Sequence, residues 1–149
     1  MDAKEALKVY FGYDSYKPGQ EEIIDSILAG KDVLAIMPTG SGKSICYQVP
    51  ALLLPGITIV ISPLISLMQD QVKALNEAGI MAGYINSSLT ESQISTVYAR
   101  ALDGAYKILY VAPERLTAPS FLEFAKRVPI SMVTVDEAHC ICLLYTSPS

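Results

Sequence analysis

Short apolar segments alternate along this chain with segments of helical periodicity. Continuously apolar runs, which indicate buried strands, cover residues 33–36, 57–61, 81–85, 108–111 and 130–135. Apolar residues at helical spacing, together with capping signals, predict helices over residues 3–10, 20–28, 45–54, 64–78, 91–102 and 120–127. Apolar strands that alternate with helices are typical of a parallel sheet with helices on both faces. The predicted fold class is therefore α/β.

A glycine-rich segment, MPTGSGKS at residues 37–44, joins the first predicted strand to a helix. Such a turn forms a phosphate cradle, because backbone N–H groups and the positive end of the helix dipole face the anion. Lys43 can reach the β- and γ-phosphates, and the Ser44 hydroxyl can ligate Mg²⁺. The general pattern has glycine where this chain has Met37, so a glycine-rich turn with an incidental Lys-Ser pair is the alternative. The candidate nucleotide-binding residues are Thr39, Gly40, Ser41, Gly42, Lys43 and Ser44.

Acidic residues follow the last predicted strand. In parallel sheets ligands bind at the carboxyl ends of the strands, and Asp136 emerges there. Its carboxylate can hold Mg²⁺ opposite Ser44, usually through water. Glu137 is placed to orient or deprotonate a water that attacks the γ-phosphate, and His139 could sense this chemistry by hydrogen bonding toward other functional regions. A solvated acidic strand end is the alternative, which the pairing with residues 39–44 disfavours.

Five motifs, in this order, resemble those of the RecQ family of superfamily 2 DNA helicases. They are FGY at 11–13 with KPGQ at 17–20, MPTGSGKS at 37–44, SPLISLMQDQV at 62–72, YVAPERL at 110–116 and DEAHCI at 136–141. The family's phosphate-loop motif also lacks the first glycine, so Met37 fits it. The resemblance covers roughly residues 7–141. It implies an incomplete RecA-like P-loop NTPase lobe with a DEAH box, and ATP and Mg²⁺ as cofactors.

The resemblance also assigns roles outside the phosphate loop. Gln20 would read the adenine edge, because its amide both donates and accepts hydrogen bonds, and Tyr13 and Lys17 would flank the base. A surface turn is the alternative for Tyr13 and Lys17. Residues 62–67 and 113–115 would lie near single-stranded DNA, unless the apolar side chains of the first segment belong to the core. The candidate catalytic residues are Lys43, Asp136, Glu137 and His139, and the candidate metal ligands are Ser44 and Asp136.

Beyond residue 141 the sequence departs from the family. The family continues with a loop of aromatic and charged residues, containing Trp, that couples DNA binding to ATP hydrolysis. This chain has CLLYTSPS at 142–149 and no tryptophan. We therefore expect residues 1–141 to form part of the ATP-binding domain, and residues 142–149 to be a disordered tail of unrelated sequence. The second motor lobe with its arginine fingers, the zinc site and the accessory DNA-binding domains are also missing from this sequence.

Composition bounds the class of protein. A chain of 149 residues that is 51% hydrophobic and 17% charged suits one domain with a real core. A net charge of −4 gives no electrostatic footprint for nucleic acid, so DNA would bind a local face. Three cysteines without metal-ligand spacing, and an N-terminus unlike a signal peptide, favour the cytoplasm. The uncharged run at 45–69 is interrupted by Pro50, Pro55 and Pro63, which argues against a membrane span.

These observations predict the ATP-binding lobe of a 3′–5′ DNA helicase that acts in DNA repair and recombination. One alternative is a P-loop NTPase of another class, such as a kinase or transporter ATPase. That class does not need Tyr13, Lys17 and Gln20, so adenine selectivity separates the two. The other alternative is a non-catalytic nucleotide-binding fragment, which an ATPase assay with and without single-stranded DNA would identify. By itself this chain is expected to bind nucleotide without unwinding DNA.

Overall fold

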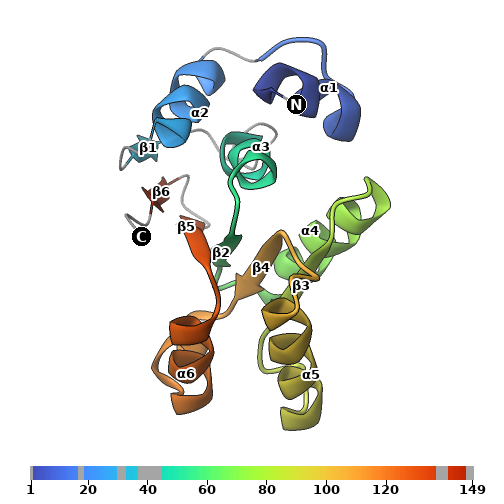
Figure 1. Ribbon diagram of the computed structural model, residues 1–149, viewed down its shortest axis with the longest axis vertical. Helices are drawn as coiled ribbons and strands as arrows, with labels where there is room; N and C mark the ends of the chain where they lie inside the picture. The colour runs from blue at the N-terminus through green and yellow to red at the C-terminus, as the bar shows by residue number, and fades with distance from the viewer. Residues whose placement is uncertain (1, 17–18, 30–32, 37–44, 137–140, 147–149) are drawn as a thin grey trace.

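The computed structural model describes residues 2–16, 19–29, 33–36, 45–136 and 141–146, and for residues 33–36, 136 and 141–146 it describes the backbone alone (Figure 1). The strands are β1 (Val33–Ile36), β2 (Ile57–Ile61), β3 (Ala82–Ile85), β4 (Ile108–Val111), β5 (Ile130–Asp136) and β6 (Ile141–Thr146). The helices are α1 (Ala3–Phe11), α2 (Gln20–Leu28), α3 (Ile45–Leu53), α4 (Ile65–Glu77), α5 (Glu91–Leu102), the 3₁₀ helix η1 (Pro113–Thr117) and α6 (Pro119–Arg127). Each predicted strand and helix is present, with ends within one residue of the prediction.

Local signals explain where several helices begin. Thr90 caps α5 with a reciprocal pair of bonds: its Oγ1 accepts from the Gln93 N–H at 3.2 Å, and Gln93 Oε1 accepts from the Thr90 N–H at 2.8 Å. This satisfies two backbone donors that a helix end otherwise leaves unpaired, and such a cap contributes about 1 kcal/mol. Asp2 caps α1 in a similar way, with Oδ1 accepting from the Glu5 N–H at 2.9 Å.

The sheet has the strand order β1-β6-β5-β2-β4-β3. Strands β5, β2, β4 and β3 are parallel to one another, whereas β6 is antiparallel to both of its neighbours. Two reversals cancel, so β1 runs in the same direction as β5. The carboxyl ends of five strands therefore lie at one edge of the sheet, and only β6 begins there.

Strand β6 departs from the sequence prediction. Residues 142–149 were expected to be a disordered tail, but the backbone of Ile141–Thr146 pairs with β1 on one side and β5 on the other. The apolar, β-prone run at these positions suits a strand flanked on both sides. Four residues separate β5 from β6, which permits an antiparallel neighbour but is too short for a parallel crossover. The division of the chain at residue 141 remains a prediction.

Helices cover both faces of the sheet, as predicted. On one face, α2, α3 and α4 pack on Val60, Ile108, Tyr110 and Met132. On the other face, α5 and α6 pack on strand residues Ile57, Ile59, Leu109 and Val111. Alternate residues of β4 thus belong to opposite cores, as the two-residue period of a strand requires. Figure 1 shows α1 to α3 above the sheet and α5 and α6 below it.

A third apolar cluster places the N-terminal helices beside α3. Leu7 of α1 and Ile24 of α2 pack with Ile45 and Val49, which lie in the first half of α3. Helices α1 and α2 are therefore fixed against the helix that follows the glycine-rich segment.

Strand β3 lies at one edge of the sheet, and α4 supplies a polar partner there. The N–H of Ala82 donates to Asn76 Oδ1 at 3.0 Å, where a further strand would otherwise offer a carbonyl. No helix within the described part of the chain is long and apolar enough to cross a membrane.

Candidate functional site

The predicted phosphate loop starts at the carboxyl edge of the sheet. Strand β1 ends at Ile36 and helix α3 begins at Ile45, so the structure has the strand and the following helix on either side of residues 37–44. Those residues, with Thr39, Gly40, Ser41, Gly42, Lys43 and Ser44 among them, lie outside the described part of the chain. Their contacts with a nucleotide remain a prediction.

The register of the sheet relates this loop to Asp136. Ala35 pairs with Cys142, and Cys142 pairs with Asp136, so the three backbones form one row across β1, β6 and β5. Two strand spacings separate Ala35 from Asp136, or about 10 Å. The segment after β1 and the segment after β5 therefore leave the sheet at the same level. Glu137 and His139, which follow Asp136, lie outside the described residues.

Of the residues predicted to recognise the base, Tyr13 is exposed and Gln20 is buried. Tyr13 follows α1 and is 48% exposed, which suits a side chain that stacks on a ligand. Gln20 is the first residue of α2 and is 3% exposed. Gly19, at φ 86°, turns the chain into that helix. Lys17 lies outside the described part of the chain.

Tyr16, between Tyr13 and Gln20, was not singled out in the sequence. Its hydroxyl oxygen is buried and has no hydrogen-bond partner in the described part of the chain. Burial raises the pKa of Tyr16, and the negative charges of Asp25, Glu21 and Asp2 raise it further. The side chain packs against the α1–α2–α3 cluster, so we read it as part of the scaffold of the base-recognition segment.

Cys46, in the first turn of α3, has an inert thiol. The residue is fully buried, and burial raises the pKa of the thiol to about 11. A thiolate is the reactive form of cysteine, so this side chain stays protonated at neutral pH. We assign it to packing.

Apolar side chains at the start of α4 are exposed, in contrast to the alternative that they belong to the core. Leu64 is 42% exposed and Leu67 is 37% exposed, while Met68 and Val72 of the same helix are buried. Helix α4 thus has its core stripe on one side and a small apolar surface on the other. This surface lies at the carboxyl edge of β2.

Two further strand exits flank that surface. The Ser62 N–H donates to the Val111 carbonyl at 3.1 Å, which joins the ends of β2 and β4. After β3, the buried Asn86 side chain accepts from the Ser88 N–H at 2.8 Å, and Ser88 Oγ accepts from Gln69 Nε2 of α4 at 3.3 Å. This loop was not among the candidate functional segments predicted from the sequence. The Asn-Ser-Ser run between a strand and a helix was the available signal, because Asn favours such turns.

Arg115, which the family resemblance places near DNA, is held by neighbouring helices. Nη2 donates to Ser120 Oγ at 3.0 Å and to the Tyr98 hydroxyl at 3.4 Å, and Nη1 lies 3.6 Å from Glu91 Oε1. The bond to Tyr98 is the main cause that raises the pKa of Arg115. The side chain is only 16% exposed. Its guanidinium therefore joins η1 to α5 and α6, which leaves little of it for a phosphate.

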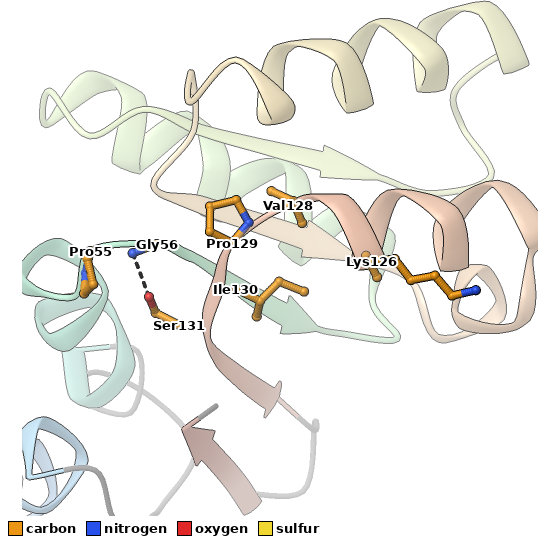
Figure 2. Close-up of a pocket in the computed structure, with 8 residues that line it drawn as sticks. Pro55, Gly56, Lys126, Val128, Pro129, Ile130 and Ser131 are labelled. Carbon is orange, nitrogen blue, oxygen red and sulfur yellow. Dashed lines mark hydrogen bonds between the residues drawn. The ribbon is translucent and has the colours of Figure 1, made fainter. Parts of the chain in front are cut away.

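A cavity of about 510 Å³ lies at the opposite, amino edge of the sheet, away from the predicted site (Figure 2). It is lined by Pro55, Gly56, Ala125, Lys126, Val128, Pro129, Ile130 and Ser131. The Gly56 N–H donates to Ser131 Oγ at 2.6 Å, and a Cβ at Gly56 would lie 2.4 Å from the Pro129 carbonyl oxygen. Glycine at position 56 thus lets the starts of β2 and β5 approach closely.

Comparison with known proteins agrees with this arrangement. A family model described as DEAD/DEAH box helicase matches residues 17–143. The ATP-dependent DNA helicase RecQ of Pasteurella multocida is 51% identical over 139 residues, which are 93% of this chain and 22% of that protein. RecQ of Bacillus subtilis is 51% identical over 140 residues, 93% of this chain and 24% of that protein. The chain thus spans about a quarter or less of these relatives.

One solved structure is similar in fold. The crystal structure of the helicase MrfA bound to DNA and AMPPNP superposes with a TM-score of 0.75 at 21% identity, and the match covers 92% of this chain and 21% of that one. The fold is therefore a RecA-like α/β lobe.

Proposed function

Because this chain belongs to the DEAD/DEAH box helicase family, we propose that it is the ATP-binding part of a RecQ-type 3′–5′ DNA helicase that acts in DNA repair and recombination. The observation that carries the proposal is the row Ala35–Cys142–Asp136, which brings the start of the phosphate loop and the acidic strand end to one edge of the sheet. Such an edge is where α/β sheets bind ligands.

The arrangement fits Mg-ATP. A strand end separated by eight residues from the N-terminus of α3 offers backbone donors and a helix dipole to phosphates. Lys43 would hold the β- and γ-phosphates, Ser44 and Asp136 would hold Mg²⁺, and Glu137 would orient the attacking water. When bound, Mg²⁺ neutralises charge on the phosphates. His139 would connect this chemistry to other functional regions.

Single-stranded DNA is the proposed partner of the whole protein, and the cytoplasm is its proposed location. The exposed Leu64 and Leu67, with the loops after β3 and β4, form the surface that would face the strand. Bases can stack on such a surface, and contacts with the phosphates would have to come from a local face, because the net charge of the chain is −4.

The first prediction tests nucleotide binding. If Mg-ATP binds with a dissociation constant near 100 μM, its presence at about 5 mM would stabilise the fold by roughly 2 kcal/mol. For a domain of this size the melting temperature would rise by about 4–9 °C. Lys43→Ala should abolish the rise, because it removes the cation that meets the phosphates. Lys126→Ala, which changes an exposed lysine at the far edge, is the matched control. An equal rise in Lys43→Ala and in the parent would place the nucleotide elsewhere.

A further inference from the structure

Four uncharged polar side chains meet in the core between α3, α4 and β4, and we call them the hydroxyl–amide cluster: Tyr47, Gln48, Gln71 and Tyr110. The Tyr47 and Tyr110 hydroxyl oxygens are 2.8 Å apart. Gln48 Nε2 donates to Gln71 Oε1 at 2.9 Å and to the Tyr110 hydroxyl at 3.2 Å. The Tyr110 hydroxyl in turn donates to Gln71 Oε1 at 3.3 Å.

The cluster connects elements that lead to different parts of the candidate site. Tyr47 and Gln48 lie in the first turn of α3, three and four residues after Ser44. Gln71 lies in α4, the helix with exposed Leu64 and Leu67 at its start. One hydrogen-bonded group therefore spans the distance from the phosphate loop's helix to the proposed DNA-facing helix.

The surroundings of the cluster make its geometry demanding. Tyr47, Gln48 and Tyr110 are at most 5% exposed. A buried polar group that loses its partner costs about 1–3 kcal/mol, so a movement of α3 against α4 would have to preserve or replace these bonds. Apolar contacts around them, such as those of Met68 and Val72, are less directional than hydrogen bonds. The polar bonds therefore add directional constraints to the relative position of the two helices.

We propose that Gln48, Gln71 and Tyr110 are positioning residues that link nucleotide binding at the phosphate loop to the DNA-facing start of α4. The inference rests on the proposed function. Phosphates that engage the N-terminus of α3 bias the position of Tyr47 and Gln48, and Gln71 passes that bias to α4. Energetic coupling between two sites is reciprocal, so DNA on α4 changes the affinity for Mg-ATP by the same factor.

The test measures coupling rather than stability. The dissociation constant for Mg-ATP is determined on the whole 149-residue chain, with and without a saturating oligothymidylate. We expect the oligonucleotide to change that constant about fivefold or more in the parent. Gln71→Met removes the acceptor of both bonds that reach α4 from the cluster, and it should bring the ratio close to one. Tyr110→Phe removes one hydroxyl, keeps the ring and leaves the Gln48–Gln71 bond, so it should lower the ratio only part of the way. The double variant should be no worse than Gln71→Met alone.

Tyr98→Phe is the matched control. It also removes a hydroxyl from a buried tyrosine, one that accepts from Arg115 at 3.4 Å on the opposite face of the sheet. A general loss of stability would affect both tyrosine variants, whereas the proposal requires that the Tyr98 variant keep the coupling ratio of the parent. A preserved ratio in Tyr110→Phe and Gln71→Met overturns the inference. The inference is also overturned if the parent binds Mg-ATP with the same dissociation constant in the presence and absence of the oligonucleotide. Absence of Mg-ATP binding in the parent overturns the proposed function itself, and the inference with it.

Discussion

Gln20 carries the predicted choice of base, and its position is an unusual one for a surface contact. It is buried at the first residue of α2, whereas its predicted companion Tyr13 is half exposed. A buried amide is held in one orientation, and a site built to bond one base edge rejects bases that leave those groups unpaired. Phosphate contacts are the same for all nucleoside triphosphates, so the oriented amide of Gln20 would supply the selectivity for adenine.

We therefore expect Gln20→Ala to weaken ATP binding and to narrow its preference over GTP and CTP. Competition between nucleotides for one site, measured by binding or by thermal shift, gives the preference directly. Gln69→Ala, in α4, controls for the loss of an amide. A Gln20→Ala variant that discriminates as well as the parent would favour a P-loop protein of another class.

Residue type alone does not show whether a side chain contacts a ligand or other parts of the protein. Arg115 follows a strand at the expected edge, yet its guanidinium joins α5 and α6 through Tyr98, Glu91 and Ser120. These partners are 5 to 24 residues away in sequence, so no local pattern identifies them. For Leu64 and Leu67 the sequence left both a DNA-facing position and a place in the core open, and the structure has both side chains exposed.

At the scale of elements, β6 joins β1 to the rest of the sheet. In the described part of the chain, β1 pairs with β6 alone, through four residue pairs, and β5 and β6 add five more. Removal of residues 142–149 would take away the strand partners of Val33, Leu34 and Ala35 and leave β1 only the pair Ile36–Ile141. Each backbone hydrogen bond contributes about 0.5–1.5 kcal/mol net.

This truncation should lower the free energy of unfolding by at least about 2 kcal/mol, whereas loss of a tail outside the fold would change it by less than about 0.5 kcal/mol. Urea denaturation of the truncated chain decides between the two. A second truncation that removes only residues 147–149 leaves β6 whole and serves as the control. If the parent and both truncated chains were equally stable, residues 142–149 would behave as the tail outside the fold that the sequence predicts.

Most elements could be predicted because their signals are local. Capping at Thr90, the turn at Gly79 and the apolar runs each define an end or a strand within a few residues. Strand β6 was missed although residues 141–146 form an apolar, β-prone run. The prediction of a disordered tail was based on the end of the family resemblance at residue 141 rather than on this apolar pattern. Pairing with β1, more than 100 residues away, is a tertiary effect that the run itself does not reveal.

At the scale of the molecule, the chain is one lobe. The strand order could not be read from the sequence, since neighbours such as β2 and β5 are about 70 residues apart. Yet the order creates the candidate site, because it brings the exits of β1 and β5 to one edge. The two RecQ relatives are about four times longer than this chain.

We expect this chain to hold Mg-ATP without unwinding DNA or hydrolysing ATP rapidly. An arginine supplied from outside the phosphate-binding lobe is worth about 10³–10⁵ in rate in P-loop enzymes, or roughly 4–7 kcal/mol. A 3′-tailed duplex and a phosphate-release assay with single-stranded DNA measure both activities. Unwinding, or ATP hydrolysis strongly stimulated by the DNA, would show that one lobe suffices.

The Asn76 side chain bears on how these molecules behave at high concentration. An edge strand with open N–H groups invites the backbone of another molecule, which is a common route to aggregation. At β3 one such group, the Ala82 N–H, is already taken by Asn76 Oδ1. An incoming strand would first have to displace an amide that belongs to the same chain. The side chain thus favours separate molecules over a sheet that continues from one copy to the next.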